Sequence, residues 1–300
     1  MKKFTVLFLA LIMSLFCLPI MAGCSFSEVF ELKYDEEDNP YYVYSASGWT
    51  SKLKGEYTIP SEHNGIPVTE IAEQGLIMTR ITKLTVPDTV TKIGNAAFAY
   101  NYSLAEIVFE EGIELEEIPQ GLCGYDRGLT SIAIPDSVKT IGALAFLYCE
   151  ALESATLPNG LETIGARAFN YTALKEITIP ASVTSLGYCA FHTCEKLTTA
   201  NLYDTQITEI PSGAFGYCPA LEKVYLPATL KKIEGALFDE DGKFVYGHAF
   251  HYNTSLKDIY FAGTAEQWNT VTVDNEAVEV QTAKYDNAAI INASLHYGNS

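Results

Sequence analysis

Apolar and polar residues alternate in a short segment that recurs along most of the chain. One copy runs Leu129-Thr-Ser-Ile132-Ala-Ile134-Pro135, where small or polar residues separate the apolar fourth and sixth positions. Alternation with a period of two predicts a half-buried strand. The proline that follows has no N–H to donate, so it should end the strand and turn the chain.

The copies are spaced with the regularity of a repeat protein. They begin at Ile81, Leu104, Leu129, Leu152, Leu174, Leu197, Leu221 and Leu256, in steps of 23, 25, 23, 22, 23, 24 and 35 residues. An earlier copy at 55–60 starts the series, so nine strands are expected. The long last step reflects an insertion between Phe238 and Phe250. Because one repeat is too small to bury a core, neighbouring copies must stack.

A second apolar block follows the strand segment, as in Val138-Lys-Thr-Ile141-Gly142-Ala-Leu-Ala145-Phe146. Its Ala-Phe end has small, helix-compatible residues, and we expect a short helical turn there. The position of Gly142 is taken by Pro119 in another copy. Because proline restricts φ to about −65°, we expect negative φ at this position, with glycine present for close packing.

The whole pattern, Leu-x-x-Ile-x-Ile-Pro-x-x-Val-x-x-Ile-Gly-x-x-Ala-Phe-x-x-Cys, resembles the BspA-type leucine-rich repeat over residues 55–262. The resemblance implies an α/β repeat fold, a right-handed leucine-rich-repeat solenoid with one parallel β-sheet and short helical turns. Residues 24–54 would form a lipid-anchored linker and N-terminal cap, and residues 263–300 a C-terminal cap. Proteins of this type are associated with adhesion, which implies a recognition module rather than an enzyme.

The N-terminus indicates where the protein is found. Lys2 and Lys3 precede an apolar run from Phe4 to Met21, the arrangement of a secretory leader over residues 1–23. The run is also nearly long enough for an uncleaved membrane anchor. Met21-Ala-Gly-Cys24 resembles the lipobox of bacterial lipoproteins, which implies lipidation of Cys24. We therefore expect an exported monomer at the bacterial cell surface that contacts the membrane only through its lipid.

The net negative charge of the chain argues against one class of partner, nucleic acids. The chain has 19 basic and 37 acidic residues, a net charge of −18. Such a chain repels phosphate backbones, so nucleic acid is not expected as a partner. With 48% of its residues hydrophobic, the chain has enough apolar surface for a large core. An extracellular protein or glycan is the expected ligand.

The fifth strand position should face solvent in every repeat. At the C-terminal end it holds two tyrosines, beside charged residues at the third position. Exposed neighbouring tyrosines are good binding anchors. The predicted sheet-face binding residues are Asn201, Lys223, Tyr225, Asp258 and Tyr260.

A second column lies two residues past the repeated phenylalanine, and Thr193 interrupts it. Its rings could be scaffold, packed on one another, or an exposed ridge that binds carbohydrate or protein. The ridge would suit a glycan-binding or nutrient-capture lipoprotein, which is the alternative function. The column consists of Tyr100, Tyr125, Tyr148, Tyr171, Tyr217 and Tyr252.

Five cysteines follow Cys24: Cys123, Cys149, Cys189, Cys194 and Cys218. An odd number cannot pair completely within one chain. Three of them share a position with Asn101 and Asn253, three residues past the repeated phenylalanine. Cys194 and Cys218 could form a bridge between adjacent turns. The favoured interpretation is a column of thiols and amides that satisfies backbone groups of the turns.

No pattern typical of catalysis or cofactor binding stands out. His248 and His251 lie near Asp239 and Asp241 but lack the spacing of a known metal site, so we expect an exposed polar insertion. A hydrolase, the least favoured function, would need these histidines and two acids in one pocket. No catalytic residue, metal or cofactor is expected.

Overall fold

The computed structural model describes residues 29–37, 39–46, 53–241, 243–280 and 283–298. The predicted leader and the lipidation site Cys24 lie outside these residues. All nine predicted strands are present in the described part. They are β3 (Lys54–Thr58), β6 (Arg80–Val86), β8 (Glu106–Phe109), β10 (Ser131–Ala133), β12 (Ser154–Thr156), β14 (Glu176–Thr178), β16 (Thr199–Asn201), β18 (Lys223–Leu226) and β22 (Asp258–Phe261).

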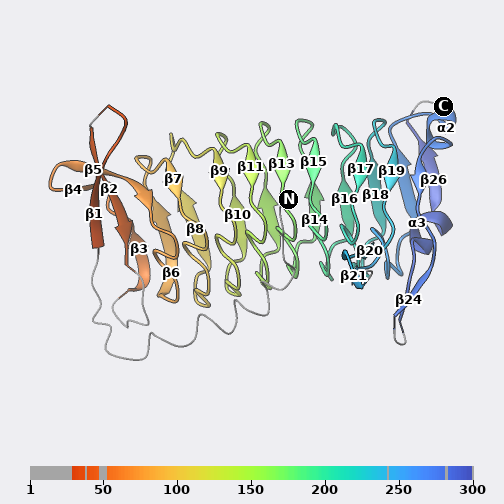
Figure 1. The fold of residues 1–300 in the computed structure, drawn as a ribbon, viewed down its shortest axis with the longest axis horizontal. Coiled ribbons are helices and arrows are strands. Elements are labelled where there is room, and N and C mark those ends of the chain that lie inside the picture. Colours follow the sequence, from red (N-terminus) through yellow and green to blue (C-terminus); the bar gives the residue numbers. More distant parts are fainter. Residues whose placement is uncertain (1–28, 38, 47–52, 242, 281–282, 299–300) are drawn as a thin grey trace.

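These strands lie side by side in chain order, so the chain is a parallel solenoid as predicted (Figure 1). Their registers keep equivalent repeat positions opposite one another: Ile132 pairs with Ala155, and Tyr225 pairs with Tyr260. In β14, for example, Ile177 is buried while Glu176 and Thr178 are exposed. The alternation read from the sequence is therefore the alternation between core and solvent.

A second set of short parallel strands runs along the solenoid, which corrects the expectation of one sheet. It is built from the second apolar block, whose isoleucines point into the core. Its members are β7 (Lys92–Ile93), β9 (Glu117–Ile118), β11 (Thr140–Ile141), β13 (Thr163–Ile164), β15 (Ser185–Leu186), β17 (Glu209–Ile210), β19 (Lys232–Ile233) and β23 (Thr272–Val273).

The short helical turns expected at the Ala-Phe segments are not helices. In the turn around Phe146, both Leu144 and Tyr148 have positive φ, at 62° and 58°. Left-handed residues four positions apart prevent a right-handed helix from forming. Backbone N–H groups instead bond to the next turn, as from Phe146 to Ala168 O at 2.8 Å. The segments are hydrogen-bonded turns that stack like a sheet.

Stacked phenylalanines fill the core beneath these turns. Their ring centroids lie 5.1 to 5.4 Å apart along Phe146, Phe169, Phe191, Phe215 and Phe250. All five side chains are fully buried. Because each ring contacts its neighbours in adjacent turns, burial is shared along the solenoid rather than within one repeat.

The glycine after the repeated isoleucine is confirmed as a close-packing residue. Gly142 and Gly165 do not have positive φ. A Cβ at Gly142 would lie 2.7 Å from the backbone N of Gln120, and one at Gly165 would lie 2.5 Å from that of Ala143. Adjacent turns thus approach too closely for a side chain.

Each end of the solenoid has added strands. At the N-terminal end, β1 (Val29–Tyr34) and β2 (Pro40–Ser45) form a hairpin; β2 pairs with β5 (Ile66–Ile71), which also pairs with β4 (Glu62–His63). At the other end lie α2 (Ala265–Trp268), β24 (Val278–Val280), β25 (Ala283–Tyr285), α3 (Ala288–Asn292) and β26 (Ser294–Tyr297). The last of these, β26, pairs with β22 and continues the main sheet.

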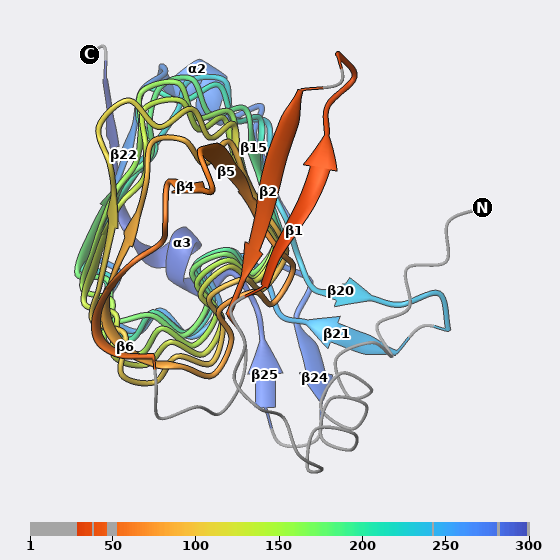
Figure 2. The ribbon, with the colours of Figure 1, turned by 90° about the vertical axis from the view of Figure 1, so that its left-hand side faces the viewer.

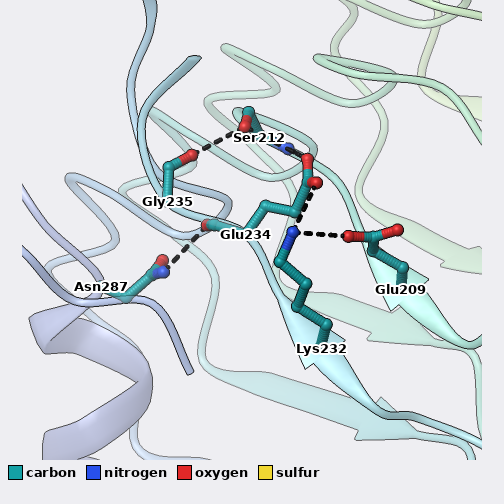
Figure 3. Close-up of polar contacts among 6 residues, drawn as sticks. All are labelled: Glu209, Ser212, Lys232, Glu234, Gly235 and Asn287. Atoms are coloured by element: carbon teal, nitrogen blue, oxygen red, sulfur yellow. Dashed lines mark hydrogen bonds and ion pairs between the residues drawn. The ribbon is translucent and has the colours of Figure 1, made fainter. Parts of the chain in front are cut away.

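Asn287, just before α3, attaches the C-terminal segment to the last turns (Figure 3). Its amide donates to Glu234 O at 3.0 Å and to Asp274 O at 2.6 Å, and its carbonyl accepts from Phe250 N at 3.0 Å. The side chain is fully buried. Lys232, whose ammonium lies 2.9 Å from Glu209 and 3.0 Å from Glu234, joins the neighbouring turns.

The insertion in the last repeat forms a hairpin of β20 (Leu237–Phe238) and β21 (Phe244–Tyr246). It projects to the right of the solenoid in Figure 2, whereas β24 and β25 point downward. At its base, the Tyr246 ring stacks on Tyr188 at 5.2 Å, and the Arg167 guanidinium lies 4.8 Å above it. These contacts fix the hairpin to the turns.

Candidate functional site

The sheet-face residues predicted at the C-terminal end come together. Tyr225 pairs with Tyr260 and with Asn201 on its other side, while Lys223 pairs with Asp258. The Tyr225 and Tyr260 rings stack with centroids 4.6 Å apart and an interplanar angle of 12°. Both are partly exposed, so neighbouring fifth positions form an aromatic surface on the sheet.

Sequence reasoning missed the next member of this surface. The strand β26 places His296 opposite Tyr260, and the two rings stack at 4.7 Å. His296 Nε2 also lies 2.9 Å from Asp258 Oδ1. The alternating segment Ser294-Leu-His-Tyr297 was the available signal, but it lies beyond the repeat period and has no proline after it.

Tyr203 and Asp204 lie beside the stacked rings and line one side of a hollow next to them. The Tyr203 ring meets Tyr225 edge-on, with centroids 6.4 Å apart. Asn201 Oδ1 accepts the backbone N–H of Tyr203 at 3.0 Å and holds this turn in place. The result is an open hollow of about 390 Å³, which we call the C-terminal tyrosine site, lined by Asn201, Tyr203, Asp204, Tyr225, Tyr260, Phe261, His296, Tyr297 and Gly298.

The other tyrosine column is largely a stack. Rings from Tyr100 through Tyr125 and Tyr148 to Tyr171 lie 4.9, 4.9 and 4.3 Å apart, with angles of 17° or less. Each ring face inside the stack is covered by the next ring, so mainly edges reach solvent. Burial raises the pKa of Tyr148 to about 12, with Tyr171 contributing to the rise.

Beyond Tyr171 the column changes. Thr193 takes the next place, and Tyr217 and Tyr252 form a separate tilted pair at 5.0 Å. Tyr171 is 39% and Tyr252 62% exposed, whereas the other four are only partly exposed. The column therefore has the packed character of a scaffold over its first part, with accessible rings where the stack ends.

The cysteine column is confirmed as a set of buried free thiols. All five cysteines are unpaired and buried. Cys149, Cys194 and Cys218 donate to carbonyl oxygens one turn back, at 3.1, 3.2 and 3.2 Å. Asn101 Nδ2 makes the equivalent bond to Leu76 O at 2.8 Å. The side chains thus satisfy backbone carbonyls of the turns.

Two further members of this column were missed. Thr172 and Asp126 lie in the same position, and both are buried. Thr172 donates to Phe169 O at 2.9 Å. Asp126 is a carboxyl among thiols and amides, and burial raises its pKa well above the usual range. Because the residue type at this position varies between repeats, the sequence alone did not reveal that Thr172 and Asp126 belong to the column.

The histidines of the insertion are not part of an exposed polar loop, contrary to expectation. His248 and His251 are buried, 0% and 3% exposed, while Asp241 at the hairpin tip is exposed. Burial lowers the pKa of both histidines. Within the residues that the structure describes, no three His, Cys, Asp or Glu side chains converge as metal ligands. No described helix has the length and apolar character needed to cross a bilayer.

Several solved structures of bacterial proteins are similar to this chain. The pneumococcal vaccine antigen PcpA is 18% identical, with 80% of this chain and 83% of that one covered and a TM-score of 0.50. A leucine-rich repeat protein from Bacteroides ovatus is also 18% identical (92% and 90% covered, TM-score 0.48). A leucine-rich cell surface protein from Faecalibacterium prausnitzii is 19% identical (84% and 99% covered, TM-score 0.44).

No curated protein matches the chain. The family described as "BspA type Leucine rich repeat region" matches it in six copies over residues 56–125 and 116–245. These ranges span most of the solenoid and coincide with the stacked strands and turns. The chain belongs to the BspA-type leucine-rich repeat family.

Proposed function

We propose that this protein is a cell-surface recognition module that binds an extracellular protein through the C-terminal tyrosine site. The stack of Tyr225, Tyr260 and His296 in an open hollow carries the proposal. Tyrosine supplies a large, rigid contact area with little loss of conformational entropy, and it is enriched among residues that dominate binding energy.

The solenoid supports this role by its shape. The strands of the main face lie side by side, about 4.8 Å apart, so a partner can contact several repeats at once. Family membership supports binding rather than catalysis. The protein would be exported and anchored by lipid on Cys24, as the sequence of its N-terminus predicts.

The packing of the tyrosines favours a protein over a glycan as the main ligand. A sugar ring stacks on an aromatic face, but most faces in both stacks are covered by another ring. Ring edges and hydroxyls remain, together with Asn201, Asp204 and Lys223. Such mixed polar and aromatic surfaces are typical of protein interfaces.

The test compares two double variants on a panel of immobilised host matrix proteins and on a glycan array. Tyr225→Ala with Tyr260→Ala removes the central rings, whereas Thr156→Ala with Thr178→Ala changes the same exposed strand position in the middle of the sheet. We expect the tyrosine pair to weaken matrix-protein binding at least about tenfold and the threonine pair to leave it unchanged. Binding to glycans alone, or equal loss in both variants, contradicts the proposal.

The anchor is tested separately with Cys24→Ala. We expect the wild type in the membrane fraction and the variant in the soluble export or culture fraction, because a lipid chain contributes about 0.8 kcal/mol per buried methylene. Membrane association that survives the change would show that the apolar segment remains as an anchor. That outcome would leave the tyrosine site unaffected.

A further inference from the structure

Beside the interruption of the tyrosine column at Thr193 lies a hollow, which we call the slot. Four consecutive turns each contribute a ring, ending at Tyr171, and Thr193 occupies the place of the next ring. One face of Tyr171 packs on Tyr148 at 4.3 Å. A hollow of about 290 Å³ opens beside Tyr171 and Thr193, and Thr172, Ala173, Glu150, Glu195 and Lys196 complete its lining.

The backbone at Thr193 matches that of the tyrosine positions. Its φ is 58°, and the tyrosines of the column have φ between 54° and 68°. The turn is therefore unchanged, and only the ring is missing. In the following turn, Tyr217 packs edge-on against His251 at 4.7 Å and 87°.

We propose that this slot binds an aromatic side chain of a partner polypeptide, which takes the place of the missing ring. The shape of the occupant follows from the column itself: at equivalent turns the same space is filled by a tyrosine ring stacked at 4.3 to 4.9 Å. Aromatic anchors in such recesses, surrounded by polar residues that exclude water, are typical of binding hot spots.

Charged residues around the slot determine which residues of the partner can flank its aromatic side chain. Glu150 is paired with Arg127 at 3.3 Å, and Lys196 with Glu153 at 3.2 Å. Glu195 makes no ion pair with any residue that the structure describes. With a net charge of −18 on the chain, the slot favours an aromatic residue flanked by lysine or arginine and disfavours one flanked by acids.

Isothermal titration calorimetry on the purified protein tests this with three short peptides. The probes are N-acetyl-Lys-Tyr-Lys amide, N-acetyl-Lys-Leu-Lys amide and N-acetyl-Glu-Tyr-Glu amide. From the size of the ring we expect a Kd of roughly 1–10 mM for the first. The leucine and glutamate peptides should each bind at least about fivefold more weakly. Methyl glucoside serves as a sugar probe and should not compete.

The decisive variant is Thr193→Tyr, which completes the stack from within the chain. Its backbone is already suited to tyrosine, so circular dichroism and thermal melting should show a folded protein, while binding of the Lys-Tyr-Lys peptide falls at least about tenfold. Tyr171→Leu keeps apolar volume but removes the aromatic wall and should weaken binding about fivefold. The pair Tyr225→Ala with Tyr260→Ala should bind this peptide normally, which separates this slot from the C-terminal tyrosine site.

The proposal fails if the leucine peptide binds as well as the tyrosine peptide, or if Thr193→Tyr retains wild-type affinity. It also fails if methyl glucoside binds more tightly than the peptide, or if no binding is detected at up to about 50 mM peptide. None of these results bears on matrix-protein binding through Tyr225 and Tyr260.

Discussion

Asp126 and Asn101 hold the same position in consecutive turns, and Asp126 Oδ1 accepts the backbone N–H of Asn101 at 2.7 Å. One turn earlier, Asn101 Oδ1 accepts the N–H of Thr79 at 2.6 Å. Both side chains thus bond to the preceding turn, but only the amide also has N–H groups to donate to carbonyls. A buried carboxyl at this position is a less complete partner than an amide.

Asp126→Asn should therefore stabilise the protein at neutral pH. Burial raises the folded-state pKa of Asp126, so the native state binds a proton more tightly than the unfolded chain. Protonated Asp126 therefore contributes stability at pH values below the pKa that it has in the unfolded chain. This contribution is lost as pH rises through the pKa that it has in the folded protein. We expect Asp126→Asn to increase the free energy of unfolding by about 1–3 kcal/mol at pH 7, and less at pH 4.

Urea unfolding at both pH values measures this effect. The relevant quantity is the difference between variant and wild type, because the net charge of −18 gives the whole protein a pH dependence of its own. Asp136→Asn, at an exposed position, is the matched control and should change little at either pH. A variant less stable than the wild type at pH 7 would contradict the role assigned to the carboxyl.

Replacing the close-packing glycines should loosen the contact between turns. Because a Cβ at Gly165 would lie 2.5 Å from the backbone N of Ala143, Gly165→Ala should lower the free energy of unfolding by roughly 1–3 kcal/mol. Gly160 is exposed, does not have positive φ, and a Cβ there would be 3.9 Å from the nearest atom. Gly160→Ala should change stability by less than about 0.5 kcal/mol. If Gly165→Ala and Gly160→Ala change the free energy of unfolding equally in chemical denaturation, the close contact between turns at Gly165 does not contribute to stability.

Asn287 should be important for holding the C-terminal segment. Asn287→Ala removes hydrogen bonds to Phe250, Glu234 and Asp274, and it leaves the backbone N–H of the buried Phe250 without this partner. We expect a loss of about 2 kcal/mol or more in the free energy of unfolding. Amide exchange should quicken in β26, next to α3. Asn292→Ala, at an exposed position of α3, is the control and should leave both measurements near wild type.

The five buried thiols should react slowly in the native protein. Burial raises the pKa of Cys189 to about 12, and it raises the pKa of Cys123, Cys149 and Cys218. At Cys194, hydrogen bonds with Cys218 and Thr172 outweigh the effect of burial and lower the pKa of the thiol, so this residue is protected by its burial alone. Because the thiolate is the reactive form, a thiol reagent at pH 8 should label these positions only after unfolding. Mass spectrometry without reductant should find all five labelled in denaturant. A missing pair of labels at Cys194 and Cys218 would reveal a disulfide.

Much of the fold could be predicted because each repeat encodes its own local structure. The alternation at Ile132 and Ile134 distinguishes core from solvent, and the register of one strand on the next follows from the repeat length. The exposed position of Tyr225 and Tyr260 follows from the same rule. The turns were harder, because left-handed residues such as Leu144 and Arg167 are not glycine and carry no local signal for positive φ.

The sequence by itself determined the solenoid, its family, the aromatic columns and the thiol column, because these depend on spacing within and between neighbouring repeats. Only the tertiary structure decided that β26 returns to β22 and adds His296 to the tyrosine stack, and that Tyr203 closes its side. These contacts join segments outside the repeat period. Their positions depend on which strand edge remains unpaired after the repeats have stacked, and that edge exists only in the folded solenoid.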